Sequence, residues 1–180
     1  YPGTCAHLST HQQHERALTR EPAIRVRAGI DEFTVHDRLH GDVAGVVDDF
    51  VLFRADQTPA YNLAVVVDDG LQGVTQVVRG DDLLDSAPRQ AWLATVLGWE
   101  VPEYVHVSLA LNAAGQRLAK RDGAVTLADC ADKGLDAVEV LHVLCRSAGL
   151  PEAADARGVL AALTPGQLTQ DLVRRPWTAV

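Results

Sequence analysis

The stretch of residues 61–82 constrains the fold of this chain most strongly. It contains two apolar runs rich in valine, residues 63–67 and 74–78. Short runs of this kind are typical of strands buried on both faces, as in a parallel sheet. Polar residues end both runs, and Arg79 follows the second. We therefore predict an α/β fold in which the two runs are neighbouring strands.

Arg79 and Asp82 follow the second predicted strand at its carboxyl end. In an open α/β sheet, ligands bind beyond the carboxyl ends of the strands, so both are candidate site residues by position. An arginine at this place serves equally well in a structural ion pair, because ion-pair networks also gather there. Both interpretations of Arg79 stay open on these residues alone.

Two segments carry a resemblance to a known family. They are Tyr61-x-Leu-Ala-x-Val-Val-Asp-Asp, continued by Gly-Val-Thr-x-Val-Val-Arg79-Gly-x-Asp82-Leu-Leu, and downstream Arg117-Leu118-Ala119-Lys120-Arg121. In their order and spacing they resemble the catalytic domain of class I glutamyl-tRNA synthetases, and most closely the shortened glutamyl-queuosine tRNA(Asp) synthetases. The second segment stands where that family has its KMSKS loop.

The resemblance implies the second half of a Rossmann-like nucleotide-binding domain with a small antiparallel β insertion and a C-terminal helical appendage. Four parts are expected: the end of a zinc-binding element with a polar helix or loop (1–19), the antiparallel connective insertion (20–58), the Rossmann-like half with its KMSKS-type loop (59–124) and the helical appendage (125–180).

Local patterns predict the elements in more detail. Strands are expected over 23–29, 33–35, 49–54 and 104–111, with turns at Gly41 and Gly45. Helices are expected over 87–97, 126–133, 137–148, 155–163 and 167–174. Ser86 is predicted to cap the first of these helices, which is apolar around most of its circumference and therefore largely buried.

The resemblance also implies the substrate-binding residues. Arg79 would bind the glutamate carboxylate, Tyr61 would line the same pocket, and Asp82 would lie near the ribose or phosphates of ATP. Without the resemblance, a tyrosine that begins a buried strand is expected in the core. The predicted pocket requires Tyr61 and Arg79 to lie on neighbouring strands.

Lys120 matches the family's second KMSKS lysine, which implies a catalytic, ATP-binding role. Adenylation places negative charge on the leaving pyrophosphate, and a mobile cation stabilises it. Arg117 replaces the family's first lysine and keeps the charge, whereas Ala119 replaces a serine and removes a hydroxyl.

Tyr1 and Cys5 form a Y-x-x-x-C element. The resemblance implies that they are two of four ligands of a structural zinc whose other ligands precede Tyr1. A free surface cysteine is the alternative. His7, His11 and His14 lie at helical spacing and could join Cys5 in a local metal site. No second shell of carboxylates is evident around them, which favours solvated side chains.

Charge, cysteine content and hydropathy limit the binding partners and the compartment that we expect for this chain. The net charge of −8 argues against strong non-specific binding to nucleic acid, but it leaves room for a tRNA held by a local arginine patch. Three widely spaced cysteines do not form a disulfide framework and favour a reducing compartment. No apolar run approaches the length of a membrane helix. We expect a cytoplasmic monomer without membrane contact.

The chain has no methionine and begins at Tyr1. We therefore expect a fragment whose HIGH-type motif precedes Tyr1 and which is inactive alone. The function implied is a ligase reaction: ATP-dependent activation of glutamate and its transfer to queuosine of tRNA(Asp). The short segment after the KMSKS-type loop favours this interpretation. A truncated discriminating glutamyl-tRNA synthetase and a non-catalytic remnant that binds tRNA or a partner stay as alternatives.

Overall fold

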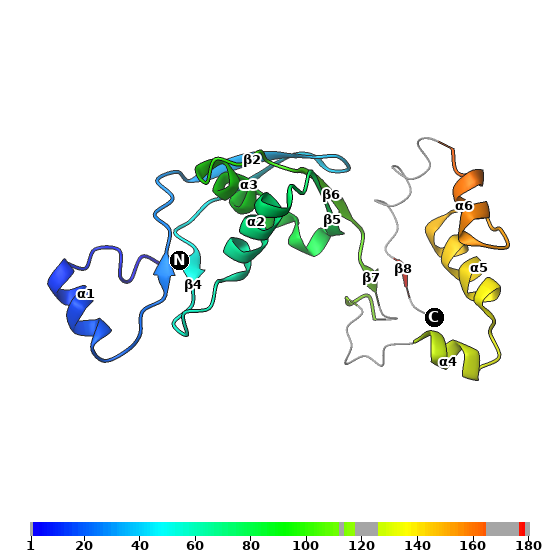
Figure 1. The fold of residues 1–180 in the computed structure, drawn as a ribbon, viewed down its shortest axis with the longest axis horizontal. Coiled ribbons are helices and arrows are strands. Elements are labelled where there is room, and N and C mark those ends of the chain that lie inside the picture. The colour runs from blue at the N-terminus through cyan, green and yellow to red at the C-terminus, as the bar shows by residue number, and fades with distance from the viewer. Residues whose placement is uncertain (1, 112–113, 118–125, 165–176, 179–180) are drawn as a thin grey trace. The chain divides into compact units, whose positions relative to one another are not determined.

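The computed structural model describes residues 2–111, 114–117, 126–164 and 177–178 (Figure 1). The chain divides into two compact units. Unit 1 comprises Tyr1–Val78 and Leu83–Val105, and unit 2 comprises Arg79–Asp82 and His106–Val180. The four-part domain division expected from the sequence stays a prediction.

Unit 1 begins with a helix and four strands: α1 (Thr10–Ala17), β1 (Ile24–Arg25), β2 (Glu32–Asp37), β3 (Gly41–Val46) and β4 (Val51–Phe53). Strands β2 and β3 pair antiparallel, as do β1 and β4, which confirms the predicted antiparallel pairing in this region. Strand β1 is shorter than predicted, and Ile24 is exposed instead of half-buried. The predicted alternation is present over residues 25–28, since Val26 and Ala28 pack against the core while the two arginines are exposed.

The predicted turn at Gly41 is close to the observed one, because Gly41 follows the β2–β3 turn directly, begins β3 and has a left-handed backbone (φ 74°). The predicted turn at Gly45 is wrong, because this glycine lies inside β3. The turn lies before them: the Asp37 carboxylate accepts hydrogen bonds from the amides of Leu39 and His40, at 2.9 Å each. Gly45 has a packing role instead. A Cβ on Gly45 would lie 2.7 Å from Cγ of Pro88, so only a residue without a side chain allows this approach.

Strands β5 (Gln76–Gly80) and β6 (Glu103–Val107) complete a four-stranded sheet in the order β3-β2-β6-β5. Strand β6 runs parallel to β2, with Tyr104 opposite Asp37. The β2–β3 hairpin therefore extends the same sheet as the predicted core strands. Strand β5 is not buried on both faces as expected, since Val78 is 59% exposed.

The predicted strand over 63–67 is wrong, because these residues lie within helix α2 (Tyr61–Gln72). The helix ends at Gly73, whose backbone is left-handed (φ 68°). Leu63 and Val66 lie three residues apart and pack into one hydrophobic cluster, while the helix contacts α3 and β4. A five-residue apolar run does not distinguish a buried strand from a helix. Tertiary packing here overrides the β preference of valine.

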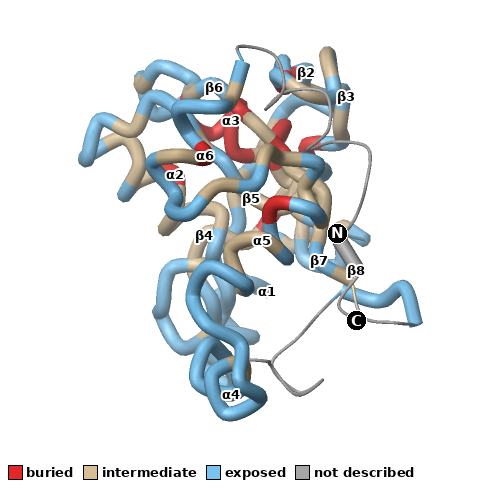
Figure 2. The backbone as a smooth tube through the Cα atoms, turned by 90° about the vertical axis from the view of Figure 1, so that its right-hand side faces the viewer, coloured by how far each residue is buried: buried red, intermediate tan, exposed pale blue. Residues whose placement is uncertain are grey.

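The 3₁₀ helix η1 (Asp81–Ser86) leads directly into α3 (Ala87–Val96). Figure 2 shows buried residues along α3, which confirms the predicted buried helix. The predicted cap at Ser86 is wrong: its backbone is already helical, and its side chain makes no capping hydrogen bond. The Trp92 ring packs edge-on against Phe50, with the ring centroids 6.0 Å apart and the planes at 82°.

The strand predicted over 104–111 is divided. Strand β6 ends at Val107, and the short strand β7 (Ala110–Leu111) belongs to unit 2. Strand β7 pairs in parallel with β8 (Trp177–Thr178), a pairing that the sequence analysis did not predict.

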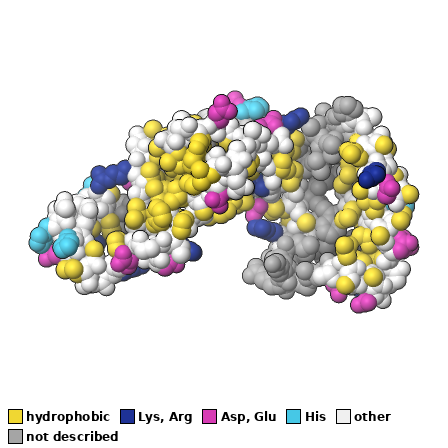
Figure 3. All heavy atoms as spheres, viewed as in Figure 1, with side chains coloured by type: hydrophobic (Ala, Val, Ile, Leu, Met, Phe, Trp, Pro, Cys, Tyr) yellow, Lys and Arg dark blue, Asp and Glu magenta, His cyan; other side chains and the backbone are white. Residues whose placement is uncertain are grey.

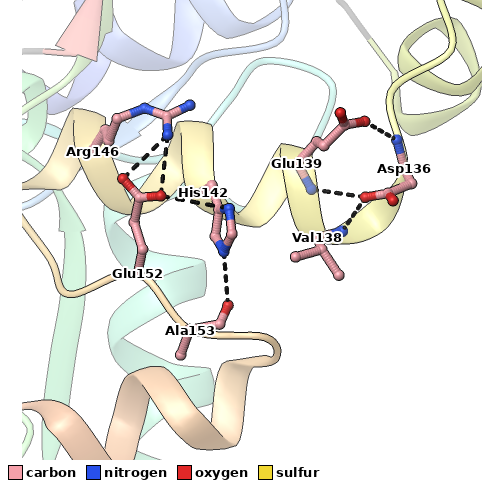
Figure 4. Close-up of polar contacts among 7 residues, drawn as sticks. All are labelled: Asp136, Val138, Glu139, His142, Arg146, Glu152 and Ala153. Atoms are coloured by element: carbon pink, nitrogen blue, oxygen red, sulfur yellow. Dashed lines mark hydrogen bonds and ion pairs between the residues drawn. The ribbon is translucent and has the colours of Figure 1, made fainter.

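Three helices of unit 2 confirm predictions: α4 (Leu127–Asp132), α5 (Ala137–Ala148) and α6 (Ala156–Ala162). The helix predicted over 167–174 lies outside the described residues. Thr126 caps α4, and its hydroxyl and amide donate hydrogen bonds that lower the pKa of Asp129. Asp136 caps α5 by accepting from the amides of Val138 and Glu139 (Figure 4).

Helix α5 holds the loop that follows it. His142 Nε2 lies 3.1 Å from the carbonyl oxygen of Ala153, and Arg146 donates to both carboxylate oxygens of Glu152 at 3.1 Å (Figure 4). Cys145 is buried on the same helix. None of the helices that the structure describes is long and apolar enough to cross a membrane.

Candidate active site

Strand β5 presents Arg79 to a side chain of the neighbouring strand. Nε of Arg79 donates a hydrogen bond to Nε2 of His106 at 3.0 Å. Arg79 is partly buried, whereas His106 on β6 is completely buried. The two residues lie 27 positions apart in the sequence, and the pairing of β5 with β6 brings them together.

The sequence analysis missed His106. It lies inside the predicted strand 104–111, between the apolar residues Val105 and Val107. A polar, titratable side chain in a strand expected to be buried was the available signal, because such groups are rarely buried without a partner. The partner itself could not be identified without the pairing of the strands.

Asp82 and Arg117 form the second contact of this region. The guanidinium of Arg117 donates to the Asp82 carboxylate. The Asp82 side chain is 25% exposed and that of Arg117 is 67% exposed. A Cβ on Gly80 would lie 2.7 Å from both Oδ1 of Asp82 and Cδ2 of Leu109, so the glycine leaves room for the carboxylate. Unit 2 therefore brings two predicted site residues into direct contact.

Tyr61 lies in unit 1 and begins helix α2, so the prediction that Tyr61 and Arg79 occupy neighbouring strands is wrong. The Tyr61 side chain is 54% exposed, which differs from the core position expected on pattern alone. A shared pocket for Tyr61 and Arg79 stays a prediction.

Most of the predicted KMSKS-type loop lies outside the described residues. Arg117 is described, whereas Leu118, Ala119, Lys120 and Arg121 are not. The contact of Lys120 with ATP phosphates therefore stays a prediction. Arg117 and its bond to Asp82 are the described part of this loop.

The described residues do not form a zinc site by themselves. Cys5 is exposed, and Nη1 of Arg16 lies 3.8 Å from its sulfur; Tyr1 lies outside the described residues. Within the described ranges, no three His, Cys, Asp or Glu side chains gather as a metal ion would require. His11 and His14 lie on the exposed helix α1, where Figure 3 shows histidine side chains at the surface.

Almost the whole chain is similar to known proteins. The family model of class I tRNA synthetases (E and Q), catalytic domain, matches residues 1–161. A protein of Nocardia farcinica named glutamyl-Q tRNA(Asp) synthetase is 56% identical over 178 residues, which cover 98% of this chain and 56% of that protein. A protein of the same name from Cutibacterium acnes is 53% identical over 92% of this chain and 48% of its own length.

A solved structure agrees with the family match. The crystal structure of a glutamate tRNA ligase from Elizabethkingia meningosepticum, in complex with its amino acid, superposes with a TM-score of 0.55 at 30% sequence identity. The match covers 66% of this chain and 25% of that one. The chain spans about half the length of the curated relatives it matches.

Proposed function

Because the chain belongs to the class I tRNA synthetase (E and Q) catalytic-domain family, we propose that the protein activates glutamate with ATP and transfers it to the queuosine of tRNA(Asp). The similarity to relatives named glutamyl-Q tRNA(Asp) synthetase carries this proposal. The enzyme is then a ligase that modifies tRNA, with glutamate, ATP and tRNA(Asp) as its substrates.

The reaction has two steps. A glutamate carboxylate oxygen attacks the α-phosphorus of ATP and expels pyrophosphate, which forms glutamyl-adenylate. A hydroxyl of queuosine then attacks the activated carbonyl carbon, forms an ester and releases AMP. Both steps depend on positioning the reactants and on stabilising charge at the leaving group.

Arg79 is proposed to bind the glutamate carboxylate. A guanidinium is always charged and its planar fork matches a carboxylate, so the pair gains two parallel hydrogen bonds. The partial burial of Arg79 supports the proposal, because a less hydrated cation binds an anion more strongly. Tyr61 is proposed to line the same pocket.

The second group of residues is proposed to act on ATP. Asp82 lies near the ribose or phosphates, and Lys120 holds the phosphates and stabilises the leaving pyrophosphate. The contact between Asp82 and Arg117 supports this assignment, because it links η1, directly after β5, to the start of the KMSKS-type loop. The two lie on different segments of unit 2.

Cys5 is proposed to bind a structural zinc together with Tyr1 and two ligands that precede Tyr1. Because the described residues supply no complete site, the proposal rests on the Y-x-x-x-C element. Zinc favours thiolate ligands, and a closed site requires four ligands. The protein is proposed to act in the cytoplasm, where ATP and tRNA are available, and to be a monomer.

A charging assay tests the proposal. The full-length protein is incubated with ATP, radiolabelled glutamate and purified tRNA(Asp) with or without queuosine, with Lys120→Ala as the control variant. We expect label only on the queuosine-containing tRNA(Asp), and little with Lys120→Ala. Nuclease digestion should locate the label on the anticodon nucleoside.

A discriminating glutamyl-tRNA synthetase is the second candidate, favoured by the similarity to the glutamate tRNA ligase structure. The same assay with tRNA(Glu) separates the two. Label on the 3′ end of tRNA(Glu), with none on queuosine-containing tRNA(Asp), would establish the second candidate. No label on any tRNA, together with binding of tRNA, would favour a non-catalytic remnant.

A further inference from the structure

The buried histidine beside Arg79 has no role in the proposed reaction so far. His106 is completely buried on β6, and its Nε2 accepts the hydrogen bond of Arg79 Nε. This hydrogen bond, 3.0 Å long, joins the ring directly to the arginine proposed to bind glutamate.

The chemistry of the contact determines where the ring carries its proton. Arginine stays protonated and has donors only, so Nε2 of His106 must present a lone pair. The ring is then neutral, with its hydrogen on Nδ1. A doubly protonated ring would instead direct an N–H and a positive charge at the guanidinium. The contact therefore holds one tautomer of His106.

The same contact restricts how Arg79 can bind an anion. A guanidinium binds a carboxylate in two parallel hydrogen bonds, either through Nε and one terminal nitrogen or through both terminal nitrogens. In Arg79 the Nε–H is directed at His106. Bidentate recognition must then use the two terminal nitrogens, so a carboxylate has to approach along the end of the side chain.

We propose that His106 is a positioning residue for substrate recognition: it orients the guanidinium of Arg79 for end-on binding of the glutamate carboxylate. The inference rests on the proposed function of Arg79. His106 acts through Arg79 and does not contact glutamate. An arginine has many rotamers, and a fixed acceptor at Nε reduces the conformational freedom that binding would otherwise remove.

Three substitutions separate positioning from packing. His106→Phe keeps a ring of similar size and removes the acceptor. His106→Gln places an amide oxygen near the position of Nε2, whereas the shorter His106→Asn does not reach it. All are made in the full-length protein, and glutamate-dependent ATP–pyrophosphate exchange is measured with thermal unfolding alongside.

We expect His106→Phe to raise the KM for glutamate by about tenfold to a hundredfold, the range for losing a hydrogen bond to a charged group, while the KM for ATP stays unchanged. His106→Gln should recover most of the glutamate affinity. The double variant Arg79→Ala/His106→Phe should bind glutamate no more weakly than Arg79→Ala, because the histidine acts through the arginine.

Other outcomes would overturn the inference. One is an unchanged KM for glutamate in His106→Phe, and another is an equal rise in the KM for glutamate and for ATP. A third is a double variant in which the losses of glutamate affinity from Arg79→Ala and His106→Phe multiply. If His106→Phe does not fold, the comparison of His106→Gln with His106→Asn decides, since equal glutamate affinity in both would reject positioning. If the wild type shows no glutamate-dependent exchange, the proposed function itself fails.

A measurement that does not depend on catalysis tests the hydrogen bond between Arg79 and His106 directly. Nitrogen-15 NMR of the imidazole distinguishes a protonated from an unprotonated ring nitrogen. We expect the proton of His106 on Nδ1 in the wild type, and a change in the Nε2 shift in Arg79→Ala. A proton on Nε2 would exclude the hydrogen bond from Arg79 and with it the inference.

Discussion

Arg117 donates a hydrogen bond to the Asp82 carboxylate, across 35 positions of sequence. The pair joins η1, the 3₁₀ helix directly after β5, to the first residue of the KMSKS-type loop. With 67% of the Arg117 side chain exposed, such an ion pair contributes only about 0–1 kcal/mol to stability. If ATP binds beside this pair as proposed, its phosphates carry more negative charge than one carboxylate, so Arg117 can exchange Asp82 for phosphate at little cost.

Arg117→Ala should therefore slow adenylation while leaving the fold almost unchanged. We expect a loss of about tenfold to a hundredfold in pyrophosphate exchange, as for one charge-assisted hydrogen bond, and a change of less than about 0.5 kcal/mol in unfolding free energy. Arg117→Lys, the residue of the related family, should keep most activity. Arg146→Ala is the matched control, since Arg146 is 58% exposed and also forms an ion pair.

Lys120→Ala should reduce the rate of adenylation and leave glutamate binding nearly intact. If Lys120 stabilises the leaving pyrophosphate, its loss removes one transition-state donor, which costs about 10²–10³-fold in kcat. Steady-state exchange at varied glutamate and ATP measures both parameters. A rise in the KM for glutamate with an unchanged kcat would contradict the assignment of Lys120 to the phosphates.

Arg79→Ala should weaken glutamate binding by about 2–5 kcal/mol, because it leaves a substrate carboxylate without its charged partner. Arg79→Lys should recover only part of the loss, since an ammonium cannot present the planar fork. Calorimetric titration with glutamate measures the affinity, and titration with ATP is the control. Equal glutamate affinities in wild type and Arg79→Ala would assign Arg79 to a structural role.

Cys5→Ser should remove zinc from the full-length protein, because a hydroxyl is a much poorer zinc ligand than a thiolate. Elemental analysis of purified wild type and Cys5→Ser measures the zinc content, and we expect one zinc per chain in the wild type. Cys130→Ser is the control, since Cys130 lies on α4 and is not part of the Y-x-x-x-C element. Equal zinc in wild type and Cys5→Ser would exclude Cys5 as a ligand.

Two substitutions on α2 test its helical burial. Val66 is 6% exposed and belongs to the core cluster, whereas Leu71 on the same helix is 75% exposed. Val66→Ala should cost about 2 kcal/mol in unfolding free energy, and Leu71→Ala less than about 0.5 kcal/mol. Chemical denaturation of both variants measures the difference. Equal losses would contradict the observed orientation of the helix.

The sequence by itself determined the elements whose signals are local. Helix α5 was predicted with its observed bounds from its apolar run and from Gly149, which ends the helix in a left-handed backbone. Strand β5 and the buried helix α3 were predicted for similar reasons, since apolar pattern and terminating residues act within a few positions. Arg79 and Asp82 were selected as candidate residues from their place after an apolar run.

Only the tertiary structure decided which residues meet. Residues 63–67 are helical because α2 packs Leu63 and Val66 into the core and contacts α3 and β4. A five-residue apolar run by itself does not distinguish a helix from a strand. His106 became a candidate through its contact with Arg79, 27 positions away in the sequence. Such contacts depend on strand pairing and on the path of the chain between the two positions, and neither residue type nor local spacing carries that information.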